Sequence, residues 1–395
     1  MTNILVINSG SSSIKFQLIS MPKEEVTASG LVERIGLEDA MLHYQSEKHQ
    51  ISEKRIIPDH SIGLQMIAKL LMDKEYGVIQ NVDDIPYVGH RVVHGGSTFS
   101  DTIVIDEAVK QKIKDLFSLA PLHNPPNYVG IQVAETIFRN ATQVAVFDTA
   151  FHQSIPQKAY TYAIPKSFLD DFKIRMYGFH GTSHKYVSTK AMQYLNNPKA
   201  KIISVHLGNG CSITAVKDGK SIDHSLGFGP VNGLIMGTRS GDIDQSVIFY
   251  LIEKLGYTSA QVSELLHKKS GMLGLTGFSD LRDIEANAAN GNTDCQLALE
   301  MNAYRIKKYI GSYAAAMNGV DAIVFTAGIG ENSSTLRAMV CSDMEYLGVE
   351  LDPDKNTLRD KVVRSIHKDS AKVQVLVIPT NEELEIAQQV FKLCL

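Results

Sequence analysis

The sequence predicts an α/β protein made of two duplicated domains. Stretches typical of strands alternate with helical patterns along the whole chain, which favours α/β architecture with largely parallel sheets. A strand, a Gly-rich polar turn and a second strand beginning Ser-Ile also occur twice, at residues 4–19 and 202–213. These copies lie about half the chain apart and suggest a duplication, although two unrelated hairpins would give the same pattern. The length of 395 residues exceeds what one core usually supports.

The individual elements follow from apolar runs and from apolar residues at helical spacing. Strands are expected at residues 4–7, 14–19, 87–93, 143–147, 202–205, 322–325 and 373–378. Helices are expected at residues 62–71, 107–117, 128–138, 245–255, 295–317 and 382–393. No Pro-rich or Gly/Ser-rich linker separates them, so any domain boundary lies in a short hinge.

The composition excludes several classes of function. A hydrophobic content of 44% and a charged content of 21% are those of an ordinary soluble globular protein. A net charge of −4 gives no reason to expect binding to nucleic acid or membranes, and no apolar run is long enough to span a bilayer. The N-terminus lacks the features of a signal peptide, and the four cysteines lack metal-ligand spacing. We therefore expect a cytoplasmic protein with reduced thiols.

The first polar turn, residues 8–15 (NSGSSSIK), is a candidate anion site. It offers backbone N–H groups, serine hydroxyls such as those of Ser11 and Ser13, and the Lys15 ammonium. The glycine spacing of a P-loop and its following helix are both missing. A plain hairpin turn is the alternative.

Two acidic residues follow strands, where ligands sit in open α/β sheets. Asp148 comes directly after the strand at 143–147, and Glu382 begins the last helix. Two acids facing a phosphate site are usually there for Mg²⁺. For Glu382, a favourable charge at a helix N-terminus is an equal alternative.

Two arginines occupy glycine-flanked settings. Arg91 lies in an apolar strand before a Gly-Gly break, and Arg239 lies in the loop 236–242 (MGTRSGD). Such arginines favour a clamp on a carboxylate or phosphate. An ion pair of the loop arginine with Asp242 or Asp244 is the alternative.

Histidines in two other segments are candidates for donating to a developing charge. His180 and His184 have a spacing that could suit zinc, but the glutamate of the zinc motif is missing and a glycine intervenes. We therefore favour His180 as a hydrogen-bond donor. His123, in a Pro-rich segment, resembles it, and a turn-capping role is the alternative.

The strand at 322–325 runs into a Gly-x-Gly segment at 328–330, which could be a turn that cradles a nucleotide before a helix. Gly-x-Gly alone is a weak signal. Ser333 occupies the third glycine position of the dinucleotide fingerprint, so a Rossmann dehydrogenase is disfavoured.

Together these motifs resemble the acetate kinase family over essentially the whole chain. Residues 8–15 look like its N-terminal phosphate signature, 206–210 like its second phosphate motif, and 237–244 like its catalytic-arginine loop. Residues 280–282 and 328–331 resemble its adenosine-contacting segments. The resemblance implies two duplicated RNase H-like (actin-like ATPase) domains flanking a nucleotide cleft. It also implies a homodimer.

The resemblance also implies the domain limits. The N-terminal domain would comprise residues 1–148 with the returning helix 381–395. The C-terminal domain, residues 149–380, would hold the second phosphate turn, the adenosine site and the dimer interface.

The resemblance further implies roles for single residues. The catalytic positions are Arg91, Asp148, His180 and Arg239. Mg²⁺, with Mn²⁺ as a substitute, would be held at Asn8 and Glu382. Acetate would be bound by Arg91, Val93, Leu122, His123, Phe179 and Pro230. ATP or ADP would be contacted by Lys15, Ser11, Ser13, His206, Leu207, Gly208, Asn209, Gly210, Asp280, Leu281, Arg282, Ala327, Gly328, Ile329, Gly330 and Glu331.

Physical chemistry questions one of these roles. Asp148 matches a residue usually called an acid/base, yet a free carboxylic acid with a pKa of about 4–5 is already ionised near pH 7. No general base is therefore needed, and we expect Asp148 to orient Arg91 or magnesium-bound water. The sequence departs from the family pattern at Ala327, where glycine is common, and at Cys211, after the second phosphate turn.

The expected function is reversible, Mg²⁺-dependent phosphoryl transfer from ATP to acetate. Propionate kinase shares the motifs and is the close alternative, although a β-branched Val93 narrows the acyl pocket and favours acetate. A non-catalytic nucleotide switch of the actin-like superfamily is the alternative from another class. It would leave Arg91, His180 and the apolar pocket without a role.

Overall fold

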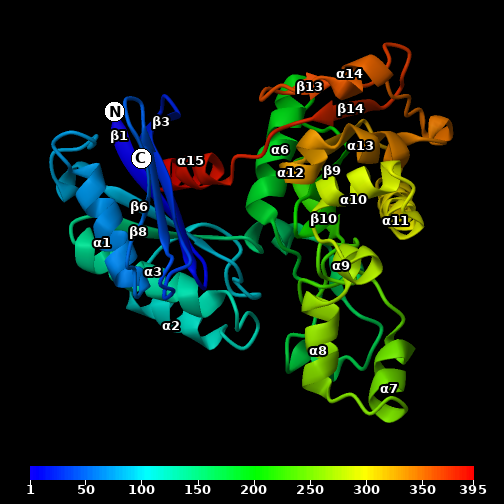
Figure 1. Cartoon of the computed structure of the whole chain (residues 1–395), viewed down its shortest axis with the longest axis horizontal. Coiled ribbons are helices and arrows are strands. Elements are labelled where there is room, and N and C mark those ends of the chain that lie inside the picture. Colours follow the sequence, from blue (N-terminus) through cyan, green and yellow to red (C-terminus); the bar gives the residue numbers. More distant parts are fainter. The chain divides into compact units, whose positions relative to one another are not determined.

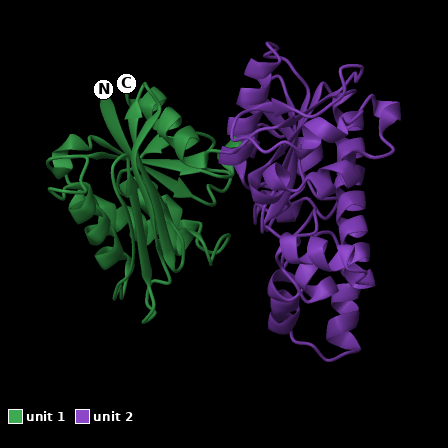
Figure 2. Cartoon of the chain, turned by 45° about the horizontal axis from the view of Figure 1, so that its top comes forward, with its two compact units in different colours: residues 1–151, 381–395 green, residues 152–380 purple.

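The computed structural model describes the whole chain, residues 1–395. It divides into two compact units, coloured separately in Figure 2. Unit 1 comprises Met1–Phe151 and Asn381–Leu395, and unit 2 comprises His152–Thr380. The domain boundary expected from the sequence, at 148/149, lies close to this division.

Unit 1 is built on a mixed sheet of eight strands. In spatial order the strands are β5 (Gln50–Lys54), β4 (Met41–Ser46), β3 (Glu25–Glu33), β2 (Ser13–Met21), β1 (Thr2–Ser9), β6 (Tyr87–Val92), β8 (Thr142–Phe147) and β7 (Ile103–Val104). The helices are α1 (His60–Leu71), α2 (Glu107–Asp115), α3 (Asn124–Ile137) and α15 (Glu382–Cys394), with a 3-10 turn η1 (Val82–Asp84).

Helices cover both faces of the central strands of unit 1. Leu5 and Ile7 of β1 share a buried core with Leu64 of α1. Side chains alternate across a strand, so the residues between them point to the other face. On that face a Cβ added to Gly89 of β6 would lie 2.8 Å from Ile386 of α15, and only glycine allows this approach. Figure 1 shows α15, the red last helix, beside the blue N-terminal strands.

Unit 2 is built on a second mixed sheet and carries most of the helices. Its strands, in spatial order, are β11 (Lys220–His224), β10 (Cys211–Lys217), β9 (Ile202–Leu207), β12 (Ala322–Thr326), β14 (Gln374–Val377) and β13 (Arg364–Ser365). Its longer helices are α6 (Gly181–Tyr194), α7 (Gln245–Glu253), α8 (Ser259–Lys268), α10 (Leu281–Ala289), α11 (Thr293–Met317) and α13 (Ser334–Cys341). The shorter ones are α4 (Gln157–Tyr160), α5 (Ser167–Asp170), α9 (Gly271–Thr276), α12 (Ala327–Asn332), η3 (Glu345–Leu347) and α14 (Pro353–Thr357), and the 3-10 turn η2 (Ala150–Ser154) spans the boundary between the units. No helix of the chain combines the length and apolar character needed to cross a bilayer.

The two sheets repeat one arrangement. The central strands of unit 1 run β3-β2-β1-β6-β8, and those of unit 2 run β11-β10-β9-β12-β14. In each unit the first three strands form antiparallel hairpins and the remaining pairs are parallel. The expected duplication of an RNase H-like α/β fold is therefore confirmed. Its two polar turns occupy equivalent places, between β1 and β2 and between β9 and β10.

The expectation of largely parallel sheets is wrong. Only β1–β6 and β6–β8 are parallel in unit 1, and only β9–β12 and β12–β14 in unit 2. Short connections explain the rest, because residues 22–24 between β2 and β3 cannot form the crossover that a parallel pair needs. Every strand and helix expected from the sequence is present to within a few residues. The polar outer strands are not expected from the sequence; β5, for example, has no buried residue.

Candidate functional site

The first polar turn closes the β1–β2 hairpin. The Gly10 N–H donates to the Ser13 carbonyl at 2.8 Å, and Ser11 is exposed at the tip. Asn8 and Lys15 are directly opposite each other in the strand register. The Lys15 ammonium, expected to contact a phosphate, lies 2.7 Å from Glu383 Oε1 of α15. A phosphate contact by Lys15 thus stays a prediction and would compete with this ion pair.

Four sequence-predicted residues come together in unit 1, from the ends of four elements. Arg91 of β6 donates from Nε to both carboxylate oxygens of Asp148, at 3.1 and 3.0 Å, and from Nη2 to Oδ2 at 2.5 Å. Asn8 Oδ1 accepts from Arg91 Nη1 at 3.3 Å, and Glu382 Oε2 lies 4.0 Å from Arg91 Nε. We call Asn8, Arg91, Asp148 and Glu382 the Arg91 cluster.

The charged groups of the Arg91 cluster shift one another's pKa values. Burial opposes the charged form of Arg91, but Asp148 and Glu382 raise its pKa above the ordinary value. Burial also raises the pKa of Glu382, and Asp148 adds to this rise while Arg91 opposes it. The cluster therefore holds one fixed cation among carboxylates. An anion that binds to Arg91 is favoured only when a further cation compensates its charge.

The residues expected around the acyl group are divided between the units. Val93 is buried in unit 1, whereas Leu122 is 64% exposed. His123 is the N-cap residue that precedes α3, and its side chain makes no capping hydrogen bond to that helix, which disfavours the capping alternative. Phe179, which is buried, and Pro230 belong to unit 2. Neither unit alone assembles the expected pocket.

In unit 2 the second polar turn lies beside His180 and Arg239. A Cβ added to Gly210 would be 3.5 Å from His180 Nε2 and 3.8 Å from Arg239 Nη1. The His180 ring stacks on that of His206, with centroids 4.4 Å apart, and its Nδ1 hydrogen-bonds Ser212 at 2.9 Å. Residues from three distant segments thus place an imidazole and a guanidinium against one glycine-rich turn.

Arg239 has no carboxylate partner. Its Nη1 donates to the Pro230 carbonyl at 3.0 Å, and burial lowers its pKa. The alternative of an ion pair with Asp242 or Asp244 is wrong. Asp242 accepts from Tyr309 at 2.6 Å, and Asp244 accepts from the N–H of Ser246 at the start of α7. A partly buried guanidinium without a counter-ion is suited to an anionic ligand.

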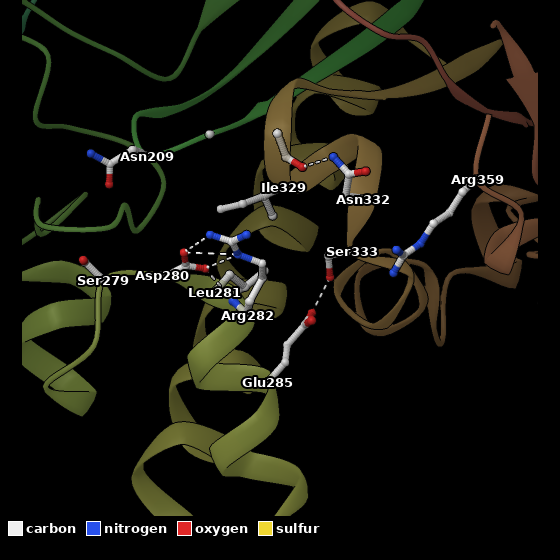
Figure 3. Close-up of a pocket in the computed structure, with 12 residues that line it drawn as sticks. Asn209, Ser279, Asp280, Leu281, Arg282, Glu285, Ile329, Asn332, Ser333 and Arg359 are labelled. Atoms are coloured by element: carbon white, nitrogen blue, oxygen red, sulfur yellow. Dashed lines mark hydrogen bonds and ion pairs between the residues drawn. The ribbon is translucent and has the colours of Figure 1, made fainter. Parts of the chain in front are cut away.

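A cavity of about 720 Å³ adjoins the second turn in unit 2 (Figure 3). Of the residues expected to contact the nucleotide, those lining it are Gly208, Asn209, Asp280, Leu281, Arg282, Gly328 and Ile329. Arg282 is exposed and donates to Asp280, with Nη2 2.5 Å from Oδ2, so this pair shapes one wall. The size and the mixed lining suit a nucleoside.

The other expected nucleotide contacts of unit 2 lie outside the cavity lining. These are His206, Leu207, Gly210, Ala327, Gly330 and Glu331. Glu331 Oε1 accepts from the Thr380 N–H at 3.1 Å, which ties α12 to the segment after β14. The expected Gly-x-Gly turn is wrong, because Gly328 and Gly330 lie inside the short helix α12. Ala327 has a left-handed backbone (φ 64°), a conformation that glycine adopts without strain.

Several cavity residues escaped the sequence reasoning: Ser279, Glu285, Asn332, Ser333 and Arg359. Glu285 follows Arg282 by three residues on α10, so helical spacing could have indicated it. Ser333 hydrogen-bonds Glu285, as Figure 3 shows, and it caps α13. Nothing in the sequence pattern marks Arg359.

Cys211 is a buried packing residue. Its Sγ donates to the Gly208 carbonyl at 3.2 Å, and burial raises the pKa of its thiol to about 12. A thiol with so high a pKa is a poor nucleophile at neutral pH. Cys211 is therefore a residue of the packing and not a reactive thiol.

Comparison with known proteins identifies the family of the chain. The model of the acetokinase family matches residues 3–388. An acetate kinase of Flavobacterium johnsoniae is 62% identical over 390 residues, 99% of each chain. The crystal structure of Porphyromonas gingivalis acetate kinase has a TM-score of 0.94 at 46% identity, covering 99% of both chains. A propionate kinase from Francisella tularensis has a TM-score of 0.93 at 42% identity, covering 99% of this chain and 100% of its own. This chain belongs to the acetokinase family.

Proposed function

We propose that this protein catalyses reversible phosphoryl transfer from ATP to acetate, giving ADP and acetyl phosphate. The observation that carries the proposal is the unpaired Arg239 beside His180 and the Gly210 turn. A guanidinium and an imidazole beside a glycine-rich turn can together stabilise the spread charge of a transferring phosphoryl group. The membership of the chain in a kinase family disfavours the alternative of a non-catalytic switch.

The chemistry needs positioning and charge neutralisation more than proton transfer. An acetate oxygen attacks the γ-phosphorus, a new P–O bond forms, and the bond to the β,γ-bridging oxygen breaks. ADP leaves with that electron pair. We assign the carboxylate of acetate to Arg91, whose orientation Asp148 fixes through the bidentate contact. Asp148 then acts by holding Arg91 and moves no proton.

Mg²⁺ fits the donor set of the Arg91 cluster. Mg²⁺ prefers hard oxygen ligands and commonly uses one or two protein groups plus phosphates and water. Asn8 and Glu382 offer an amide oxygen and a carboxylate, and burial raises the pKa of Glu382 although Arg91 and Lys15 oppose that rise, so a further cation would be favourable there. When bound, the ion would neutralise and orient the phosphate oxygens. We propose these two residues as its protein contacts.

The nucleotide base and sugar would occupy the 720 Å³ cavity of unit 2. Asp280, Arg282 and the Gly328 segment line it, which supports the adenosine contacts expected from the sequence. The phosphates would then lie along the Gly208–Gly210 turn, near Arg239.

Acetate is favoured over propionate by Val93, which is buried and β-branched. The similarity to a propionate kinase keeps that activity as the second candidate. A hydroxamate assay over acetate, propionate and butyrate tests both. We expect the highest kcat/KM for acetate, with a preference of about 10–200-fold per methylene at most. A higher kcat/KM for propionate would overturn the acyl assignment, and no acyl phosphate with any acid would overturn the function.

We further propose that the protein is a homodimer that works in the cytoplasm. Helix α7 buries none of its residues and exposes Phe249 and Tyr250, each at 58%. Leu255, which follows α7, is also exposed, and exposed apolar side chains near one another are of the kind that protein interfaces cover. All four cysteines are free thiols, as expected in a reducing compartment. Light scattering of a Phe249→Glu, Tyr250→Glu variant should show a monomer.

A further inference from the structure

A chain of hydrogen bonds between buried histidine and serine side chains in unit 2 leads away from His180 Nδ1. Ser212 Oγ is 2.9 Å from His180 Nδ1 and 2.7 Å from His184 Nε2. On its far side, His184 Nδ1 is 2.8 Å from Ser204 Oγ. Ser204, Ser212 and His184 are fully buried, and burial keeps the pKa of His184 well below its ordinary value. His184 is therefore neutral and has one N–H to donate.

The direction of the hydrogen bonds in this chain follows from Ser204. A neutral imidazole donates from one nitrogen and accepts at the other, whereas a hydroxyl has one proton to donate. The Ser204 hydroxyl has no partner other than His184. If His184 donated to Ser204, the Ser204 proton would be buried without an acceptor, which proteins avoid. Ser204 therefore donates to His184 Nδ1, and His184 carries its proton on Nε2.

The donor and acceptor of each remaining hydrogen bond in this series then follow. His184 Nε2–H donates to Ser212 Oγ, so the Ser212 proton is directed to His180 Nδ1. His180 Nδ1 is an acceptor, and the neutral His180 ring carries its proton on Nε2. That nitrogen is the one that faces the Gly210 turn, near Arg239 Nη1.

We propose that Ser204, His184 and Ser212 are positioning residues, which fix His180 as the Nε2–H tautomer and so aim a donor at the transferring phosphoryl group. The inference rests on the proposed function and deepens it. His180 touches the reacting group, and the three residues behind it act only through its tautomer and orientation. It also explains the i, i+4 spacing of His180 and His184. Both nitrogens of His184 are engaged by serine hydroxyls, so the pair is not a metal site.

Two neighbouring histidines fix the backbone just before His180. The Phe179 N–H donates to His224 Nε2 at 3.1 Å, and the Phe179 carbonyl is 2.9 Å from His152 Nε2. These contacts hold the main chain, whereas the Ser212 hydroxyl contacts the His180 ring itself at Nδ1. The two effects are therefore separable by mutation.

The test combines spectroscopy and kinetics on the full chain. In ¹⁵N-histidine NMR, assigned with His180→Gln, wild-type His180 should show Nε2 protonated and Nδ1 as a hydrogen-bond acceptor. Ser212→Ala should remove the acceptor signature of Nδ1 and lower kcat about 10–100-fold, less than the 10²–10³-fold typical of deleting a whole donor. KM for both substrates should change less than about threefold, because ground-state binding is not removed. Ser204→Ala, a milder change, should give a smaller loss of the same kind and serves if Ser212→Ala does not fold.

Ser188→Ala is the matched control. Ser188 is equally buried on α6, but its hydroxyl donates only to the Lys185 carbonyl at 3.1 Å. Its kcat should stay within about twofold of wild type. A protonated Nδ1 in wild-type His180, or an unchanged kcat in both Ser212→Ala and Ser204→Ala, would overturn the proposal. A wild-type protein with the assigned tautomer but no kinase activity would refute the proposed function alone.

Discussion

Arg91 and Arg239 have opposite electrostatic settings. Arg91 is held by a bidentate contact to a buried carboxylate, with a second carboxylate 4.0 Å away. Arg239 donates to a backbone carbonyl and has no acidic partner. The first arginine is oriented and its charge compensated before any ligand arrives, whereas the second keeps its charge for the ligand. One sequence feature, an arginine beside glycines, thus supports two different physical roles.

The largest loss of activity is expected when the Arg239 side chain is removed. Arg239→Ala should lower kcat at least about 10³-fold, as for other arginines that stabilise phosphoryl transfer. The melting temperature should stay the same or rise, because a partly buried, uncompensated cation is lost. The hydroxamate assay and thermal unfolding measure both quantities.

Arg239→Lys is the conservative comparison. It should recover little activity, because an ammonium cannot reproduce the planar guanidinium contacts. If Arg239→Ala kept more than a tenth of the wild-type kcat, the assignment of Arg239 to the phosphoryl group would be wrong.

Removing Arg91 should instead destabilise the fold. Asp148 is 1% exposed, and Arg91→Ala removes the guanidinium that forms an ion pair with its carboxylate. We expect the free energy of unfolding to fall by about 3–5 kcal/mol in urea titrations. Adding Asp148→Asn to Arg91→Ala should restore part of this loss, because the uncompensated charge is then gone. If the Arg91→Ala and Arg239→Ala variants were equally stable, the inference that only Arg91 stabilises the fold through an ion pair would be wrong.

Asp148→Asn alone should separate orientation from proton transfer. The amide keeps one acceptor for Arg91 but loses the ion pair, so kcat should fall about 10–100-fold, within the range of a displaced positioning group. The loss should be constant from about pH 6 to 9, because acetate is ionised throughout that range. Full recovery at high pH would show that Asp148 moves a proton after all.

The sequence predicts the central strands and the helices of this protein better than the outer strands of its sheets. The duplicated fold is correctly predicted from the alternation of strands and helices and from the repeated Ser-Ile hairpin. Both are visible because the central strands are apolar. The outer strands are missed and the sheets wrongly expected to be parallel, because polar strands such as β5 carry little hydrophobic signal. Strand direction depends on connection length, which the apolar pattern does not encode.

The candidate site shows the same division. Motifs identify Arg91, His180 and Arg239, since charged residues among glycines and apolar strands are conspicuous. They do not reveal which arginine has an acidic partner. From the sequence, Asp148 could orient Arg91 and Asp242 could equally pair with Arg239. Only the tertiary structure assigns one carboxylate to Arg91 and directs the other to Tyr309. The Ser204–His184–Ser212 chain likewise depends on contacts between α6, β9 and β10 that no spacing rule predicts.

The smallest expected effect concerns anion binding without turnover. Inorganic phosphate at about ten times its Kd should stabilise the wild-type fold by about 1.4 kcal/mol. The gain should disappear in Arg239→Ala and persist in Arg282→Ala, whose side chain is 89% exposed and already paired with Asp280. Sodium chloride at equal ionic strength controls for general screening. Equal stabilisation of wild type and Arg239→Ala would mean that phosphate binds elsewhere and that the uncompensated charge of Arg239 does not select the anion.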